Sequence, residues 1–175
     1  VIADLARLNV HVKVITGDNR FVTSHLAETV GLDPTAMLTG DAVAKLDDEA
    51  LWQAAPKASI FAEIDPQQKE RIVRALQRTG HSVGYLGDGI NDAAALHAAD
   101  VGISVAQAVD VARESADIIL LQRDLDVLRT GVEDGRRTFV NTLKYISTTT
   151  SANFGNMISM AVAAPLLPFL PMVAK

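Results

Sequence analysis

Short apolar runs alternate with longer segments of helical periodicity over residues 1–123. Each run is rich in β-branched or other apolar residues and is about four to six residues long, the length of a buried strand. The five runs are residues 12–16, 59–64, 82–86, 101–105 and 118–121. Strands that alternate with crossover helices are typical of a mainly parallel, doubly wound sheet. The pattern therefore predicts an α/β fold.

Two of the intervening helices have recognisable first residues. The helix predicted over residues 20–30 follows Asn19, a residue type favoured at the N-cap. The helix predicted over residues 66–79 follows Asp65 and has Gln68 at the reciprocal capping position. Further helices are predicted over residues 47–55, 93–99 and 107–116. These helices complete the alternation that the α/β fold requires.

A different pattern begins at Asp124. Apolar residues at 125, 128, 132, 139, 143 and 146 fit one helix of roughly 22 residues, about 33 Å long. No charged residue occurs between Lys144 and Lys175, and residues 154–174 are enough to cross a hydrocarbon layer of about 30 Å. Prolines at 165, 168 and 171 argue against a helix that continues to the end.

This pattern divides the chain into three predicted regions: an α/β domain at 1–123, a long helix at 124–153 and a membrane segment at 154–175. Basic residues at 136, 137 and 144 precede the segment, as is typical of the cytoplasmic side. A hydrophobic C-terminus of a soluble protein is the less favoured alternative. Asn153 and Asn156 have amide oxygens that suit a cation within a helix bundle, or hydrogen bonds between helices.

Composition excludes several classes of protein. With 16 basic and 21 acidic residues the net charge is −5, so no nucleic-acid partner is expected. The chain has no cysteine, which excludes thiolate metal sites and a disulfide scaffold. The four histidines have no metal-ligand spacing and are expected at surface or packing positions.

The first candidate site is the polar cluster Thr16, Gly17, Asp18 and Asn19, directly after a predicted strand. Ligands of open parallel sheets bind beyond the carboxyl ends of the strands. Gly17 allows close backbone approach, and the Thr16 hydroxyl and nearby amides can donate to an anion. Taken alone, the cluster also fits a plain turn between a strand and a helix.

The second candidate is Lys69, one turn inside the helix that Asp65 opens. A cation near a helix N-terminus adds to the positive end of the helix dipole, which is unfavourable unless an anion lies between them. A solvated lysine is the alternative for this residue alone.

The third candidate is the run GDGIND at residues 87–92. Two glycines flank Asp88 on a tight turn, and Asn91 and Asp92 follow. Carboxylate and amide oxygens suit Mg²⁺, which is usually held by few protein ligands together with phosphate oxygens. An acidic turn that caps the next helix would need fewer such residues. A hydroxyl, a cation and paired carboxylates at one sheet edge are the groups that stabilise a transferring phosphoryl group.

These residues resemble the phosphorylation domain of P-type cation-transporting ATPases, within the haloacid dehalogenase-like superfamily. The strings TGDN at 16–19, DPQQK at 65–69 and GDGINDAAAL at 87–96 carry the resemblance. The runs HAADVGIS, DVARESADIILL, GRRTFVNTLKYI and TSANFGNM are most similar to the magnesium-transporting branch. The resemblance covers nearly the whole chain and implies a haloacid dehalogenase-like Rossmannoid sheet.

The resemblance also implies roles for individual residues. Thr16 and Lys69 would hold the phosphoryl group, and Asp88 would bind Mg²⁺. Asn91 and Asp92 would order the site, with Asp92 a second candidate metal ligand and catalytic residue. Gly17 and Asp18 would lie near the nucleotide.

On this resemblance the chain is part of an ATP-driven Mg²⁺ transporter of the cell membrane, with ATP and Mg²⁺ as cofactors. Its expected partners are ATP, the divalent cation, membrane lipid and the N-terminal parts of the same pump. The region at 124–153 would be the stalk helix that leads into the fifth membrane helix.

One departure from the family pattern is the absence of the DKTGT motif that carries the phosphorylated aspartate. We therefore expect a C-terminal fragment whose sheet lacks the nucleophile strand and which does not phosphorylate itself. One alternative is a soluble phosphatase of the same superfamily, for which Asp4 is the only aspartate ahead of Thr16, in surroundings that look helical. The other is an inert remnant that binds Mg²⁺ or phosphate.

Overall fold

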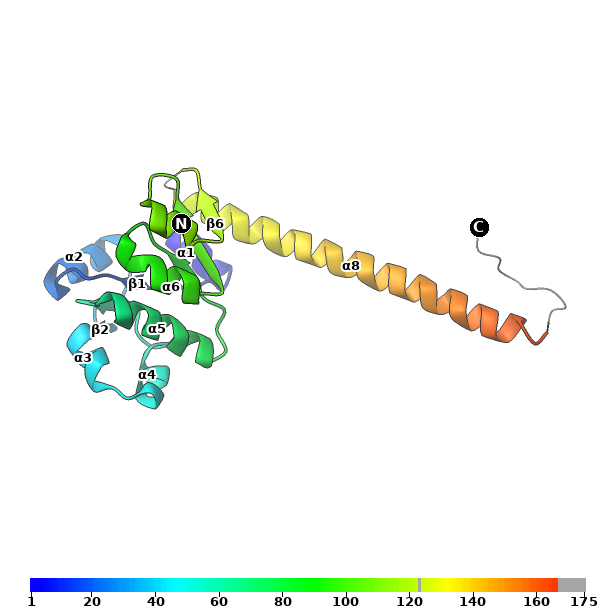
Figure 1. Cartoon of the computed structure of the whole chain (residues 1–175), viewed down its shortest axis with the longest axis horizontal. Coiled ribbons are helices and arrows are strands. Elements are labelled where there is room, and N and C mark those ends of the chain that lie inside the picture. Colours follow the sequence, from blue (N-terminus) through cyan, green and yellow to red (C-terminus); the bar gives the residue numbers. More distant parts are fainter. Residues whose placement is uncertain (123, 167–175) are drawn as a thin grey trace. The chain divides into compact units, whose positions relative to one another are not determined.

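A computed structural model describes residues 1–122 and 124–166. The chain divides into two compact units, Val1–Arg129 and Thr130–Lys175, which are described separately below. The first unit is an α/β domain, and all of its strands run parallel to their neighbours (Figure 1). Its strands are β1 (Val14–Ile15), β2 (Met37–Thr39), β3 (Ile60–Ala62), β4 (Gly84–Leu86), β5 (Val101–Val105) and β6 (Ile118–Leu120).

The helices of the first unit alternate with these strands. They are α1 (Ile2–Arg7), α2 (Arg20–Val30), α3 (Gly40–Lys45), α4 (Asp48–Ala54), α5 (Pro66–Arg78), the 3₁₀ turn η1 (Ile90–Asp92), α6 (Ala93–Ala98) and α7 (Asp110–Glu114). The five predicted strands are present, with β1, β3, β4 and β6 shorter than expected. The α/β class predicted from the apolar pattern is confirmed.

The strands form two parallel sheets of three, in the orders β1-β3-β2 and β4-β5-β6. In the first sheet Ile15 lies opposite Phe61, and in the second Tyr85 lies opposite Gly102. Within the described residues β1 and β4 are edge strands, each with one neighbour. The sequence pattern missed β2, because three residues are too few to show a period.

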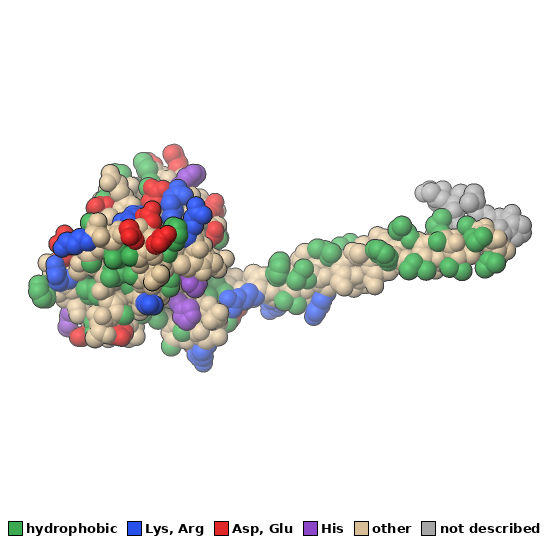
Figure 2. All heavy atoms as spheres, turned by 90° about the horizontal axis from the view of Figure 1, so that it is seen from below, with side chains coloured by type: hydrophobic (Ala, Val, Ile, Leu, Met, Phe, Trp, Pro, Cys, Tyr) green, Lys and Arg blue, Asp and Glu red, His purple; other side chains and the backbone are tan. Residues whose placement is uncertain are grey.

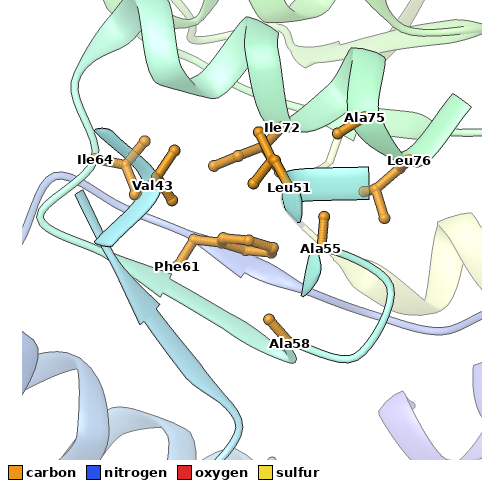
Figure 3. Close-up of a cluster of buried hydrophobic side chains, with 9 residues drawn as sticks. All are labelled: Val43, Leu51, Ala55, Ala58, Phe61, Ile64, Ile72, Ala75 and Leu76. Atoms are coloured by element: carbon orange, nitrogen blue, oxygen red, sulfur yellow. The ribbon is translucent and has the colours of Figure 1, made fainter. Parts of the chain in front are cut away.

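Helix α5 packs against both sheets. Its N-terminus has the predicted capping box, in which Asp65 and Gln68 each bond the other's backbone amide. One core cluster gathers Ile72 of α5 with Phe61, Leu51 and other apolar side chains, as Figure 3 shows. Val73 of the same helix belongs to a second cluster, with Tyr85 and Leu96. A helix shared by two cores fixes the strand ends on either side of it.

Residues that bridge the two clusters confirm this arrangement. Ile15 of β1 and Val83, just before β4, both pack against both clusters. Trp52 of α4 packs against the first cluster, as expected for an exterior helix. All four histidines are exposed, so none of them lies within the core.

Helix α8 (Leu125–Ala163) begins where the sequence predicts the long helix. It has 39 residues rather than about 22, because it continues through the charge-free segment and ends shortly before Pro165. In Figure 2 hydrophobic side chains line its visible surface, and none of its residues is buried.

The predicted membrane segment at 154–175 is covered only as far as Leu166, and residues 167–175 lie outside the described part. Among the helices of residues 1–122 and 124–166, none combines the length and apolar character needed to span a bilayer.

Candidate functional site

The residues of loop 16–19 follow β1 and are bonded to the turn between β3 and α5. The Thr16 carbonyl accepts a hydrogen bond from the Ile64 amide at 3.0 Å, and the Asp18 carbonyl accepts one from the Glu63 amide at 2.9 Å. Within the loop the Thr16 hydroxyl donates to Asp18 Oδ2 at 2.9 Å. Asn19 caps α2 by accepting from the Phe21 amide. The loop therefore lies beside the N-terminus of α5.

Lys69 lies one turn inside α5 and points to the third candidate cluster. Its Nζ donates to Asp92 Oδ1 at 2.8 Å, and the two side chains are only 12% and 13% exposed. A cation and a carboxylate this far from water must be paired, because each alone would carry a large desolvation cost. The Lys69 ammonium is thus fixed by an ion pair, and the alternative of a solvated lysine is wrong.

Loop 87–92 wraps around the carboxylate of Asp92. The Gly89 amide donates to Asp92 Oδ2 at 3.1 Å, and the Tyr85 hydroxyl donates to Asp92 Oδ1 at 2.9 Å. A Cβ on Gly87 would lie 2.5 Å from that of Asp92, so only glycine permits this close approach. Both carboxylate oxygens of Asp92 are therefore engaged by donors of the chain itself.

These contacts shift two pKa values in opposite directions. Burial raises the pKa of Asp92, but hydrogen bonds from Lys69, Tyr85 and Gly89 outweigh it, and the pKa lies below its ordinary value of 3.8. Burial, together with the negative charge of Asp92, raises the pKa of Tyr85 well above its ordinary value of 10.0. Asp92 is thus an anion and Tyr85 a neutral donor at pH 7.

The backbone around Asp88 is fixed from β5 and the start of α7. The hydroxyl of Ser104, which is fully buried, donates to the Gly87 carbonyl at 2.8 Å. The Val109 amide bonds the Asp88 carbonyl at 3.2 Å. The side chains of Asp88 and Asn91 are exposed. Asp88 is therefore an exposed residue on a loop whose backbone is hydrogen-bonded to β5 and to the start of α7.

A cavity of about 350 Å³ opens beside Asp88, lined by Leu86, Gly87, Asp88, Val105, Leu120, Asp124 and Leu125. Within the described part of the chain no three histidine, cysteine, aspartate or glutamate side chains gather as a complete metal site. One accessible carboxylate with room beside it still fits Mg²⁺, which keeps most of its water and phosphate ligands. The donor set fits a hard cation shared with an anionic ligand.

Comparison with known proteins supports this arrangement of motifs. Residues 1–100 match the profile of the family described as "Hydrolase: haloacid dehalogenase-like hydrolase". The chain belongs to the haloacid dehalogenase-like hydrolases. The profile includes all three candidate clusters, at 16–19, 69 and 87–92.

Two curated relatives make the resemblance more specific. The chain is 53% identical over 99% of its length to "Magnesium-transporting ATPase, P-type 1" of Salmonella typhimurium, and 54% identical over 93% of its length to the protein of that name from Escherichia coli K12. It spans 19% and 18% of the lengths of these relatives. The predicted resemblance to magnesium-transporting P-type ATPases is confirmed.

A solved structure has the same fold. The crystal structure of a zinc-transporting PIB-type ATPase in its E2.Pi state aligns with a TM-score of 0.74 and 26% identity. The alignment covers 93% of this chain and 22% of that protein. The haloacid dehalogenase-like domain seen here is therefore one that occurs in P-type ATPases.

Asp4, the nucleophile required by the soluble-phosphatase alternative, does not lie at a strand end. It is part of α1, where it accepts a hydrogen bond from Arg7. A haloacid dehalogenase-like phosphatase built on Asp4 would need this carboxylate beyond a strand of the sheet. The structure gives that alternative no support.

Three contributors to the site were missed in the sequence: Tyr85, Ser104 and the pair of Arg20 with Glu63. The alternation of residues 84–86 places Tyr85 inward, and a buried tyrosine hydroxyl requires a partner, so Tyr85 carried a usable signal. Ser104 and Glu63 had no recognisable signal in the sequence, because the residues they bond are distant along the chain.

Proposed function

We propose that this chain is the part of a P-type ATPase phosphorylation domain that holds a phosphoryl group and its Mg²⁺ ion. The carrying observation is the 2.8 Å ion pair between Lys69 and Asp92, which joins the DPQQK and GDGIND motifs. Backbone hydrogen bonds also join the residues just before α5 to the TGDN loop. All three motifs thereby lie at the carboxyl ends of β1, β3 and β4, where ligands of parallel sheets bind.

In the proposed site each residue has a distinct task. The Gly17 amide donates to the phosphoryl oxygens or the nucleotide, Asp18 lies near the nucleotide, and Lys69 supplies positive charge. The Thr16 hydroxyl joins them by turning from its acceptor Asp18 Oδ2 to a phosphoryl oxygen. Asp88 contributes a carboxylate to Mg²⁺, which neutralises the developing charge when bound. Asp92 orients Lys69 through Oδ1, and its Oδ2, which accepts from the Gly89 amide, keeps a lone pair for the metal as the second candidate ligand. Asn91 completes the polar rim.

The free edges of β1 and β4 support the proposal that a further strand completes the sheet. Within the described residues β1 and β4 lack a second neighbour, and Ile15 and Val83 pack against the same two cores. A strand between them would end beside Thr16 and Asp88, the place for the phosphorylated aspartate of a DKTGT motif. The printed sequence has no such motif, so we propose that this chain alone does not phosphorylate itself.

For the longer protein we propose ATP-driven Mg²⁺ transport across the cell membrane, as the names of the curated relatives suggest. The domain division at 1–123, 124–153 and 154–175 belongs to this proposal, with α8 as the stalk. The absence of charge between Lys144 and Lys175 supports a membrane segment there. Asn153 and Asn156 are proposed contacts for the transported ion.

Titration of the isolated chain with Mg²⁺ and inorganic phosphate, followed by amide NMR, tests the site. We expect Mg²⁺-dependent shifts at Thr16, Gly17 and Asp88. Lys69→Met should weaken phosphate binding at least tenfold, and Asp88→Ala should remove its dependence on Mg²⁺. Lys57→Met, at an exposed lysine, is the matched control. Binding that is unchanged in both site variants would contradict the proposal.

Incubation with labelled ATP and Mg²⁺ tests the absence of the nucleophile. We expect no acid-stable, hydroxylamine-sensitive phosphoprotein from this chain. A stable acyl-phosphate would show that one of its own carboxylates is the nucleophile.

A further inference from the structure

Glu63 has a left-handed backbone conformation and lies in the short connection between β3 and α5. Its φ is +59°, in the left-handed region that residues other than glycine seldom adopt. Among the described residues, Asn9 is the only other non-glycine residue with a positive φ. Glu63 lies between β3 and Asp65, the N-cap of α5. A strained backbone persists only where its surroundings hold it in place, and such residues cluster at functional sites.

The side chain of Glu63 binds Arg20, the first residue of α2, directly after loop 16–19. Arg20 Nε donates to Oε1 at 3.1 Å and Arg20 Nη2 donates to Oε2 at 3.0 Å, the paired geometry that suits a guanidinium and a carboxylate. The Arg20 amide also donates to Oε1, at 3.2 Å. The ion pair lowers the pKa of Glu63, through the hydrogen bond from Arg20, so the carboxylate is charged at pH 7.

The backbone of Glu63 is fixed on both sides. Its amide donates to the Asp18 carbonyl at 2.9 Å. Its carbonyl lies against Gly40, where a Cβ would be only 2.1 Å away, so the position demands glycine. The left-handed turn thus aims the amide at loop 16–19 and the carbonyl at Gly40, and leaves the carboxylate for Arg20.

We propose that Glu63, with Arg20, is a positioning residue that sets the distance between Thr16 and Lys69 at the phosphoryl site. Thr16 follows β1, whereas Lys69 lies in α5. The turn at Glu63 leads covalently into α5 and is hydrogen-bonded to the loop that follows β1. Glu63 touches no phosphoryl group itself. The inference rests on the proposed function, because the spacing matters only if both residues contact one anion.

The test compares binding with stability in the isolated chain. Glu63→Gly keeps the left-handed backbone, which glycine adopts freely, and removes the side chain with its carboxylate. We expect its thermal midpoint to stay at or above that of the parent chain, while the Kd for inorganic phosphate with Mg²⁺ rises at least fivefold. Amide exchange at Gly17 and Asp18 should accelerate.

Three further variants make the test specific. Arg20→Met should weaken phosphate binding as much as Glu63→Gly, and the double variant should bind no worse than either single one, since the two act as a unit. Arg74→Met removes an exposed ion pair with Glu70 elsewhere on α5 and should change nothing. Glu63→Asp, which keeps the charge but not the reach, should give intermediate binding.

The outcomes separate the two proposals. If the parent chain binds no phosphate and Lys69→Met changes nothing, the proposed function fails, and this inference fails with it. If Lys69→Met weakens binding but Glu63→Gly and Arg20→Met do not, only the positioning role is overturned. If Glu63→Gly loses stability and binding in proportion, Glu63 is merely structural and the inference is again overturned.

Discussion

The two sides of the candidate site are held in place by different means. On the α5 and β4 side, a largely buried cluster packs on the second hydrophobic core and consists of Lys69, Asp92 and Tyr85. On the β1 side, loop 16–19 is largely exposed, and Arg20, its anchor, is 48% exposed. Charges removed from water are costly to leave unpaired, whereas exposed pairs contribute little stability. Substitutions on the first side should therefore reduce stability, and those on the second should reduce binding alone.

The largest expected loss of stability follows from Asp92→Ala. The substitution leaves the Lys69 ammonium and the Tyr85 hydroxyl without their shared acceptor, and we expect the free energy of unfolding to fall by about 3 kcal/mol. Urea unfolding followed through Trp52, which is partly buried against the first core, measures it. Adding Lys69→Met should restore part of the loss, because the orphaned charge is then absent. A double variant less stable than Asp92→Ala would contradict a pair held by mutual charge.

Ser104→Ala should have the next largest effect. Ser104 is fully buried, and without its hydroxyl the Gly87 carbonyl loses a donor that water cannot replace, at a cost of about 2 kcal/mol. Ser115→Ala is the matched control, because that exposed hydroxyl bonds the Val111 carbonyl, which the Ser115 amide also bonds. Equal urea midpoints for the two variants would mean that the support beneath Asp88 is not rigid.

The distance along the chain between bonded residues explains what the sequence could predict. Local signals predicted α2 and α5 well, since Asn19, Asp65 and Gln68 act within one turn of their own helix. The convergence of Lys69 and loop 87–92 was predicted from parallel strands that end at one sheet edge, and the two do meet, although β3 and β4 belong to different sheets. The pairing of Ser104 with Gly87, and the turn that brings Glu63 against Gly40, join segments far apart in the chain. No local pattern encodes such contacts.

The division into two sheets was beyond the sequence for a related reason. Alternating strands and helices predict one parallel sheet, but strand order depends on which distant edges meet. β2 is only three residues long and leaves no period to detect. The long helix was underestimated because the loss of charge after Lys144 marks a change of composition, whereas the helix ends close to Pro165.

Tyr85→Phe should cause the smallest loss of stability, and its dependence on pH tests the buried side of the site most directly. Removing the hydroxyl leaves Asp92 Oδ1 with Lys69 alone and should lower the free energy of unfolding by about 1 kcal/mol at pH 7. The folded-state pKa of Tyr85 is raised above its ordinary value of 10.0, so its contribution is complete below pH 10 and is lost as the pH rises further. The gap between parent and variant should therefore be constant from pH 7 to 9 and narrow above pH 10. Urea unfolding of the parent chain and of the variant at each pH measures the gap. A gap that persists unchanged above pH 10 would mean that Tyr85 ionises as easily in the folded chain as in the unfolded one, which a buried hydroxyl bonded to a carboxylate cannot do.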